Sequence, residues 1–540
     1  GKDPALTILR ATSSDREPTP EILDSIRTSI GIDGGPLHVI GHWLAGVARG
    51  DLGRSWVSGA DVGPDAVDAF GVSLSLMAAA LGVGVIVAAA LVLPALRDGL
   101  RGRPRPRGGA ASAVLISLPE YLLAPILMLV LAVYLRILPP FGWGGPEKVI
   151  MPALSLGLPT GGYLGGLVSD AVTAAFSERW VATWSTAGIR GWPLAGAVLR
   201  RALAPLTGQV ALVVVALTGG AVAVEKIFAI PGLGRELLDA ASAQDVPALQ
   251  AQILLLLALA LTTGVIAGAV RRLLMGRAAG AGGLTAPPPV EHPGRAARVI
   301  AVSGAALLVL MVAVGIRRDP YAVVADKLAQ PSAALPLGAD SLGRDVLARV
   351  AHGAVSTVSG AVIVTVVCFV IAILVGLAPR AATGFIEVAN AAPPILAGLI
   401  VAGVSGPSAT GAAVAVAGVG WAPLASHAAG LVAENRQRPD VLLAPVLGEG
   451  RVRITLTRVL PAVVGPLARH AALRLPGKAL ALAALGFLGL GAQSPAPEWG
   501  LVLSDALPYI ERAPWAVATP AAALVILSIT SVATSRSMRR

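Results

Sequence analysis

The stretch FGVSLSLMAAALGVGVIVAAALVLPAL, residues 70–96, contains no charged side chain. A membrane-spanning helix needs about 20 mostly apolar residues, so this stretch is long enough to cross a bilayer. Similar runs recur near 112–138, 150–172, 203–225, 248–270, 298–316, 354–378, 384–404, 409–433, 460–485 and 514–534. The sequence therefore predicts an all-α membrane protein with about 11 spans.

The composition supports this prediction. Of 540 residues, 55% are hydrophobic and only 14% are charged, whereas about a quarter are charged in soluble proteins. A net charge of +11 could indicate nucleic-acid binding, but the arginines lie in short loops between apolar runs. We therefore expect membrane lipid around the chain and no nucleic acid. The single cysteine, Cys368, lies within an apolar run, which excludes disulfides and cysteine-based metal sites.

Basic residues gather after alternate runs, and the positive-inside rule places such loops in the cytoplasm. Cytoplasmic loops are thus expected at 97–107, 179–201, 271–277, 380, 436–458 and 536–540, with a cytoplasmic C-terminus. Loops poor in basic residues, near 139–149, 228–247, 405–408 and 488–513, are expected outside. This orientation also puts residues 1–67 outside, so we expect that the chain as given lacks an N-terminal apolar segment, either a first span or a cleaved signal.

Two halves are joined by a Gly- and Pro-rich stretch, residues 276–297, which is predicted to be a cytoplasmic linker because it cannot build a core. The expected organisation is an outer segment at 1–67, a membrane domain at 68–275 and a second at 298–540, whose outer segment is 317–352. Thr19 before Pro20 is a helix start signal within the first outer segment.

The halves repeat one another. Gly-Asp-Leu-Gly-Arg-Ser at 50–55 matches Asp-Ser-Leu-Gly-Arg-Asp at 340–345, and Pro-Gly-Leu-Gly at 231–234 is paired with Leu-Gly-Leu-Gly at 488–491. Each half also has an Arg-rich loop in which a glycine, Gly188 or Gly448, precedes helix-compatible sequence. Their shared order indicates two copies of one unit.

These blocks resemble the permease subunits of the peptide/opine/nickel class of ABC importers, here with both subunits in one chain. The first half carries Val-Glu-Lys-Ile-Phe-Ala-Ile-Pro-Gly-Leu-Gly-Arg at 224–235; the second carries Leu-Gly-Ala-Asp-Ser-Leu-Gly-Arg-Asp-Val-Leu at 337–347 and Phe-Leu-Gly-Leu-Gly-Ala-Gln at 487–493. The resemblance implies two type I permease bundles in a bacterial inner membrane. The implied substrates are di- or oligopeptides, with nickel or a metal-opine chelate as the alternative.

The resemblance further implies that the cytoplasmic loops couple transport to partner ATPases. The residues concerned are Thr183, Thr186, Ala187, Gly188, Leu199 and Arg200 in the first half, and Ala444, Leu447, Gly448, Arg453, Leu460 and Pro461 in the second. One departure from the family pattern is Pro445, which we expect to interrupt the helix before Gly448 because proline lacks a backbone donor.

The outer segments are implied to form a gate and a collar that meets a substrate-binding protein. The residues assigned to them are Gly50, Asp51, Leu52, Gly53, Glu225, Phe228, Pro231, Gly232 and Gly234 in the first half, and Asp340, Leu342, Gly343, Arg344, Asp345, Gly489, Gly491 and Trp499 in the second.

The chain shows no catalytic constellation of its own. Its Gly-Lys pairs, at 1–2 and 477–478, lack the remaining residues of a phosphate-binding loop. We therefore expect no cofactor on this chain, with ATP and Mg on two ATPase subunits or one fused ATPase chain. His38 and His42 are four residues apart, but an amphipathic helix is favoured over a metal site there.

Few charged residues are noted within the spans: Glu120, Asp170, Glu225 and Glu387. For each, a charge at the membrane interface is favoured over contact with substrate. An ion-coupled secondary transporter would need coordinating or proton-relay residues in the spans, and a membrane enzyme would need a catalytic group. Both are weaker interpretations than an importer permease.

Overall fold

The computed structural model describes residues 5–6, 9, 17–30, 35–104, 109–275, 295–377, 384, 386–387, 389–390 and 392–538. Contacts divide the chain into two compact units, residues 1–295 with 538–540, and residues 296–537. The predicted linker falls almost wholly outside the described residues.

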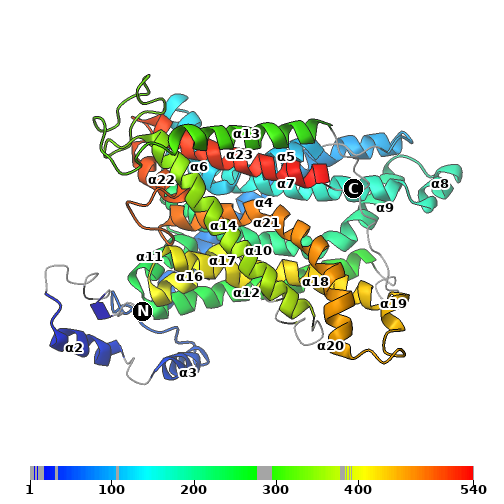
Figure 1. The fold of residues 1–540 in the computed structure, drawn as a ribbon, viewed down its shortest axis with the longest axis horizontal. Helices are drawn as coiled ribbons and strands as arrows, with labels where there is room; N and C mark the ends of the chain where they lie inside the picture. Colours follow the sequence, from blue (N-terminus) through cyan, green and yellow to red (C-terminus); the bar gives the residue numbers. More distant parts are fainter. Residues whose placement is uncertain are drawn as a thin grey trace. The chain divides into compact units, whose positions relative to one another are not determined.

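The first unit is built from helices (Figure 1). They are α2 (Pro20–Ile30), α3 (Pro36–Val47), α4 (Val62–Leu100), α5 (Gly109–Ile116), α6 (Glu120–Leu127), η2 (Met128–Tyr134), α7 (Pro146–Phe176), α8 (Arg179–Thr186), α9 (Trp192–Leu203), η3 (Ala204–Leu206), α10 (Thr207–Phe228), α11 (Leu233–Ala243) and α12 (Val246–Met275). Helix α2 begins at Pro20, as its start signal predicts.

The second unit is helical too. Its elements are α13 (Arg295–Gly315), α14 (Val346–Gly376), α16 (Pro394–Ser405), α17 (Ala409–Gly420), α18 (Ala422–Arg436), α19 (Pro439–Leu442), α20 (Arg451–Ile454), η5 (Thr455–Val459), α21 (Leu460–Leu488), α22 (Trp499–Ala506), η6 (Leu507–Tyr509) and α23 (Pro514–Met538). Strand-like pairing among the described residues is limited to three isolated bridges.

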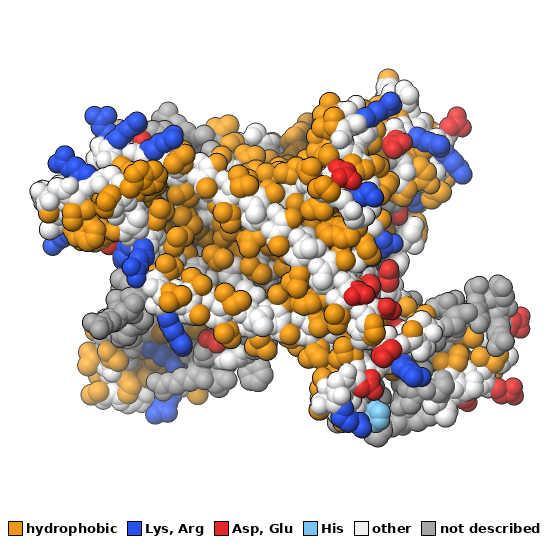
Figure 2. All heavy atoms as spheres, turned by 180° about the vertical axis from the view of Figure 1, so that it is seen from behind, with side chains coloured by type: hydrophobic (Ala, Val, Ile, Leu, Met, Phe, Trp, Pro, Cys, Tyr) orange, Lys and Arg blue, Asp and Glu red, His pale blue; other side chains and the backbone are white. Residues whose placement is uncertain are grey.

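The helix lengths confirm an all-α membrane protein. In the part of the chain that the structure describes, eight helical stretches are long and apolar enough to span a membrane, and Glu120–Tyr134 and Pro394–Ser405 are shorter apolar helices. Helix α7 covers the remaining predicted run and has 31 residues, although it is less apolar than those eight. The hydrophobic side chains that cover the exposed flanks of the long helices are suited to lipid (Figure 2).

The run 112–138 is not one helix, which corrects the prediction of a continuous span. Helix α5 ends at Ile116 and α6 begins at Glu120. Pro119 lies at this break, where its missing N–H requires no helical partner.

Glycines on α7 let α4 approach its backbone closely. Gly157, Gly161 and Gly165, spaced by four, face α4: a Cβ on Gly157 would lie 2.6 Å from the carbonyl oxygen of Ala80, and one on Gly161 would lie 2.7 Å from that of Gly84. Small residues at this spacing are typical of close helix pairs in membranes. The α4–α7 pair thus forms the centre of the first unit.

This core also positions the loop that follows α7. Val172 on α7 and Ala195 and Val198 on α9 are fully buried in one hydrophobic cluster. Helix α8 lies at the opposite end of the first unit from α11 (Figure 1).

In the second unit, α14 packs against α17, α18 and α21, and α21 packs against α22. Asp345 caps the start of α14 by accepting hydrogen bonds from the N–H groups of Leu347, at 2.8 Å, and Ala348, at 3.4 Å. Helices α19 and α20 lie at the opposite end of this unit from α22 (Figure 1).

Candidate functional site

A glycine turn follows α8 in the first unit. Gly188 has a φ of +85°, the N–H of Ala187 donates to the carbonyl of Thr183 at 3.0 Å, and that of Ile189 donates to Trp184 at 2.9 Å. This pattern ends a helix through a left-handed residue, which glycine adopts without a Cβ penalty. We name residues 183–191 the first glycine turn.

The second unit repeats this turn. Gly448 has a φ of +81°, the N–H of Leu447 donates to Leu443 at 3.3 Å, and that of Glu449 donates to Ala444 at 3.1 Å. We name residues 443–450 the second glycine turn. Helix α19 ends at Leu442, so the interruption expected from Pro445 is present.

An ion pair with a later arginine lies near each turn. Arg201 on α9 lies 2.8 Å from Glu178, which precedes α8. Arg458 in η5 lies 2.5 Å from Glu449 and holds the pKa of that carboxyl below its ordinary value, mainly through the hydrogen bond. The first pair ties the start of α8 to α9, and the second ties the second glycine turn to η5.

The predicted coupling residues gather around these turns. Thr183 and Thr186 lie on α8, and Ala187 and Gly188 form the turn after it, while Leu199 and Arg200 lie on α9. Arg200 donates to the carbonyls of Leu273 and Leu274 near the end of α12, at 3.2 and 2.7 Å. In the second unit, the predicted residues lie in the turn, in α20 and at the start of α21: Ala444, Leu447, Gly448, Arg453, Leu460 and Pro461.

Apolar side chains are exposed directly after the first glycine turn and within the second, beside arginines. Trp192 is 82% exposed in the first unit, and Val446 and Leu447 are 81% and 74% exposed in the second. Segments this rich in arginine belong outside the hydrocarbon core, where such apolar surface is typical of a protein contact.

Near the far end of the first unit, Glu225 is fully buried rather than placed at an interface. Its carboxylate accepts from the hydroxyl of Ser73 at 2.6 Å and from the N–H of Arg235, in the first turn of α11, at 3.0 Å. Ser73 accepts in turn from the N–H of Leu233 at 2.8 Å. The expectation of an interfacial charge was wrong because a helix N-terminus satisfies this carboxylate inside the protein.

The Pro-Gly-Leu-Gly motif has its explanation here. A Cβ on Gly234 would lie 2.7 Å from the Cα of Val222 and 2.9 Å from a carboxylate oxygen of Glu225, and Gly232 packs against the same carboxylate. Glycine is needed because the backbone passes directly over Glu225.

The second unit builds the same arrangement around Glu498. This glutamate caps α22 by accepting from Gly500 and Leu501, both at 3.0 Å. The hydroxyl of Thr357 donates to it at 3.2 Å and accepts from the N–H of Trp499 at 3.4 Å. Burial raises the pKa of Glu498 to about 7, against the lowering effect of these hydrogen bonds.

The paired glycine motifs do not lie at equivalent places. Helix α10 ends with Ala229 in the left-handed conformation, and α21 ends with Gly489 in the same conformation. The first motif therefore begins two residues after its helix cap, whereas the second, at 488–491, straddles its cap. The sequence pairing was displaced because short Gly-Leu matches fix no register.

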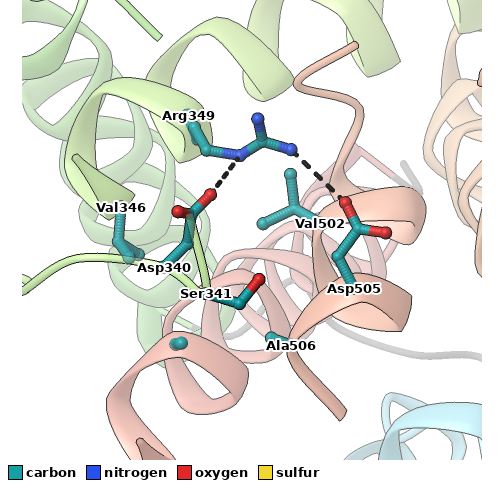
Figure 3. A pocket seen from close by; sticks show the side chains of 8 residues that line it. Asp340, Ser341, Val346, Arg349, Val502, Asp505 and Ala506 are labelled. Carbon is teal, nitrogen blue, oxygen red and sulfur yellow. Dashed lines mark ion pairs between the residues drawn. The ribbon is translucent and has the colours of Figure 1, made fainter. Parts of the chain in front are cut away.

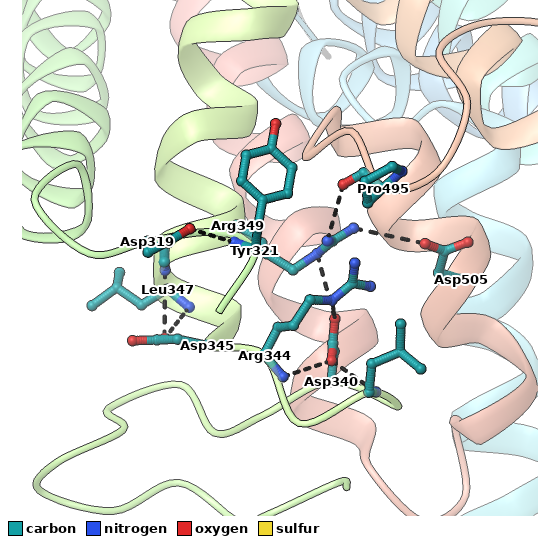
Figure 4. Close-up of polar contacts among 11 residues, drawn as sticks. Asp319, Tyr321, Asp340, Arg344, Asp345, Leu347, Arg349, Pro495 and Asp505 are labelled. Atoms are coloured by element: carbon teal, nitrogen blue, oxygen red, sulfur yellow. Dashed lines mark hydrogen bonds and ion pairs between the residues drawn. The ribbon is translucent and has the colours of Figure 1, made fainter. Parts of the chain in front are cut away.

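In the second unit, a buried arginine joins the repeated outer block to α22. Figure 3 shows Arg349, only 1% exposed, between Asp340 and Asp505, beside a small pocket. Its Nε lies 3.5 Å from Asp340, its Nη2 lies 3.7 Å from Asp505, and its Nη1 donates to the carbonyl of Pro495 at 3.3 Å. Asp340 also accepts from the Nε of Arg344 at 2.7 Å (Figure 4).

Gly343 closes this block with a φ of +82° and packs against the carbonyl of Ala325. Arg318 pairs with Asp345 at 2.7 Å, and Leu342 is half exposed beside them. The predicted residues of the block therefore act mainly through a turn and its ion pairs.

The equivalent block of the first unit is tied down differently. The indole N–H of Trp43 donates to the carbonyl of Leu52 at 2.9 Å, and Asp51 accepts from the N–H of Gly53 at 2.8 Å. Asp245, before α12, accepts from the hydroxyl of Ser55 and, at 3.1 Å, from the N–H of Trp56. Gly50, with a φ of +85°, begins the turn.

Sequence reasoning missed a group of cations within one span. Arg469, His470, Arg474 and Lys478 all lie on α21, inside the predicted run 460–485. The four-residue spacing of His470, Arg474 and Lys478 was a usable signal, but the apolar residues on either side gave the run a high mean hydropathy. No group of three or more histidine, cysteine or acidic side chains among the described residues is arranged to hold a metal ion.

A family model described as "Binding-protein-dependent transport system inner membrane component" matches the chain twice, at residues 109–279 and 369–538. The peptide transport system permease protein SapC of Escherichia coli O6:H1 is 36% identical over 202 residues, covering 35% of this chain and 67% of that protein. The di/tripeptide transport system permease protein DppC of Pseudomonas aeruginosa is 34% identical over 204 residues, covering 36% and 67%. The glutathione transport system permease protein GsiC of Salmonella choleraesuis is 31% identical over 248 residues, covering 44% and 78%.

Proposed function

The chain belongs to the inner membrane components of binding-protein-dependent transport systems, and from this we propose that it imports short peptides with the help of partner ATPases. It is the permease of an ABC importer, and its two permease domains lie in one polypeptide. The double match to the family model is the observation that carries this function.

Peptides are the proposed substrates because the similar permeases named above serve peptide, di/tripeptide and glutathione transport. The alternative of nickel or a metal-opine chelate is not favoured by these relatives. The relatives alone support this substrate class, so measuring transport of peptides is the test of it.

Coupling to ATP hydrolysis is proposed to run through the two glycine turns. In support, exposed apolar side chains lie at each turn: Trp192 directly follows the first, and Val446 and Leu447 lie within the second. We propose that ATP and Mg are bound by separate subunits that dock on these side chains, while an extracytoplasmic binding protein meets the outer segments. The turns, the linker and the C-terminus would then lie in the cytoplasm.

Co-purification tests this coupling. With tagged chain and its ATPases co-expressed, Leu447→Asp together with Val446→Asp is expected to lose the ATPases, since a charge in an apolar contact leaves a buried, unpaired group. Val324→Asp, an equally polar change at an exposed valine far from both turns in sequence, is expected to keep them. Equal recovery of ATPase with the double variant would contradict docking at the second turn.

A further inference from the structure

Helix α21 carries His470, Arg474 and Lys478 at steps of four residues. Side chains at this spacing lie along one face of a helix. The Nε of Arg474 donates to the Nε2 of His470 at 3.1 Å, so these two side chains are in contact. We name the three residues the cationic face.

The cationic face lies deep within a span. Arg474 is about 14 residues from each end of α21, which at 1.5 Å per residue is about 21 Å. An arginine at such depth almost always faces the protein interior or a water-filled cavity, because exposure to lipid is expensive. Because Arg474 is exposed on the second unit, we expect its side of the cationic face to meet water or protein and not lipid.

No carboxylate neutralises Arg474 or Lys478. Neither residue forms an ion pair with any other residue that the structure describes. Lys478 is only 6% exposed, and Cys368 and Arg474 are close enough to act on its charge. Of the two cations only Lys478 is buried, whereas Arg474 is exposed on the second unit. A buried charge is normally paired, so Lys478 lacks a counter-ion among the described residues.

A second helix adds to the face. His427 on α18 stacks on His470, with ring centroids 4.3 Å apart and an interplanar angle of 25°. Two imidazoles, a guanidinium and an ammonium group are thus contributed by two helices, about midway along α21. All four can donate hydrogen bonds to an oxyanion.

We propose that His427, His470, Arg474 and Lys478 bind a carboxylate of the peptide during its passage through the permease. This proposal rests on the peptide-import function proposed above. A guanidinium pairs with a carboxylate through two parallel hydrogen bonds, and Lys478 supplies a further charge nearby. We call these four residues the carboxylate station. The station selects substrates that carry a carboxylate, and that carboxylate is the counter-ion of Lys478.

The phosphate of an anionic lipid offers the same oxyanion chemistry. The peptide is the favoured source because Arg474 lies about 21 Å from either end of its helix, whereas headgroups lie at the membrane surfaces. Vesicle composition separates the two sources in the test.

The test uses the complete transporter, with ATPases and binding protein, in phosphatidylcholine vesicles. Uptake of Ala-Glu is compared with uptake of Ala-Gln amide, which lacks both carboxylates. Arg474→Gln is expected to lower the uptake of Ala-Glu about tenfold relative to the wild type while leaving Ala-Gln amide unchanged. Arg474→Lys should restore part of the loss, because it keeps the charge. Arg469→Gln, at an exposed arginine one residue before His470, is the matched control and should change neither.

Equal loss for both peptides would overturn the proposal. So would an effect of Arg474→Gln that appears only after phosphatidylglycerol is added, since the station would then bind lipid. If the wild type takes up neither peptide, the proposed function fails, and a binding measurement then tests the carboxylate station by itself. In that measurement, Glu-Glu should raise the Tm of the purified wild-type chain but not that of Arg474→Gln. A wild-type Tm that Glu-Glu does not shift would also refute it.

Discussion

Ser73 and Thr357 occupy equivalent positions: each is the twelfth residue of its helix, and each hydroxyl donates to a buried glutamate. Each hydroxyl also accepts the first N–H of a short helix that follows in the chain. The glutamates come from different places, since Glu225 lies in the last turn of α10 whereas Glu498 precedes α22. The two units thus share one contact, made by a hydroxyl, a carboxylate and the first N–H of a short helix. The two glutamates do not occupy equivalent positions in the repeat, so comparing the acidic residues of the halves does not show it.

Removal of the shared hydroxyl should destabilise the first unit. Ser73→Ala leaves the N–H of Leu233 and part of the Glu225 carboxylate without a buried partner, at a cost of about 1–3 kcal/mol. Thermal unfolding of the purified chain in detergent would show a lower Tm. Ser75→Ala is the control, because that hydroxyl bonds only the carbonyl of Val72 on its own helix; equal destabilisation by both would contradict the shared contact.

The pKa of Glu498, raised by burial to about 7, predicts a pH dependence. Between pH 4.5 and 7 the folded state holds a proton that the unfolded state has released, so stability falls as pH rises through this window and is level above it. The fall attributable to this group is about 3 kcal/mol, at about 1.4 kcal/mol for each pH unit.

Glu498→Gln should flatten this part of the profile in Tm measurements from pH 5 to 8. Glu511→Gln, at an exposed glutamate, should keep the wild-type slope. A Glu498→Gln profile parallel to that of the wild type would show that the carboxyl is ionised throughout.

The α4–α7 contact predicts opposite effects for one substitution at two glycines. Gly161→Ala adds a methyl group that would lie 2.7 Å from the carbonyl oxygen of Gly84, and overpacking of this kind costs about 1–3 kcal/mol. Gly82→Ala places its methyl group in open space on α4 and should be neutral or stabilising by up to about 1 kcal/mol. Denaturation of the two variants side by side measures the difference; a neutral Gly161→Ala would contradict the close approach.

The glycine turns predict a backbone effect on transport. No atom lies within 4 Å of the Cβ position of Gly188 or Gly448, so Ala there strains only the left-handed backbone, by about 1–2 kcal/mol. Gly188→Ala should lower ATP-driven uptake while the chain still folds, and Gly188→Asn should retain more, since Asn tolerates this conformation. The measurement is the rate of uptake by the wild type, Gly188→Asn and Gly188→Ala, which should fall in this order. Uptake by Gly188→Ala equal to that of the wild type would contradict a role of the turn in transport.

Much of the fold was predictable because lipid demands long apolar helices. The runs at 70–96 and 514–534 fall within α4 and α23, and Pro20 begins α2 where its start signal placed it. The break at Pro119 was missed because hydropathy continues through it, although proline itself was a readable signal. The spacing of Gly157, Gly161 and Gly165 also announced a close helix contact that hydropathy does not detect.

The site was less predictable, because its decisive feature is burial. Glu225 near a span end fits an interfacial charge equally well, and only the return of α11 over it shows otherwise. Lys478 and Arg474 were missed because the run 460–485 that contains them is apolar on average. The turn at Gly448 was found because its backbone requirement is local to the sequence.

The central claim is that this chain is the permease of an ATP-driven peptide importer. The most direct measurement is uptake of labelled dipeptide into vesicles that contain the chain, with its ATPases and binding protein added or withheld. We expect uptake only when both partners and hydrolysable ATP are present, with Gly188→Ala impaired. Uptake by the chain alone, driven by a proton or sodium gradient, would contradict it.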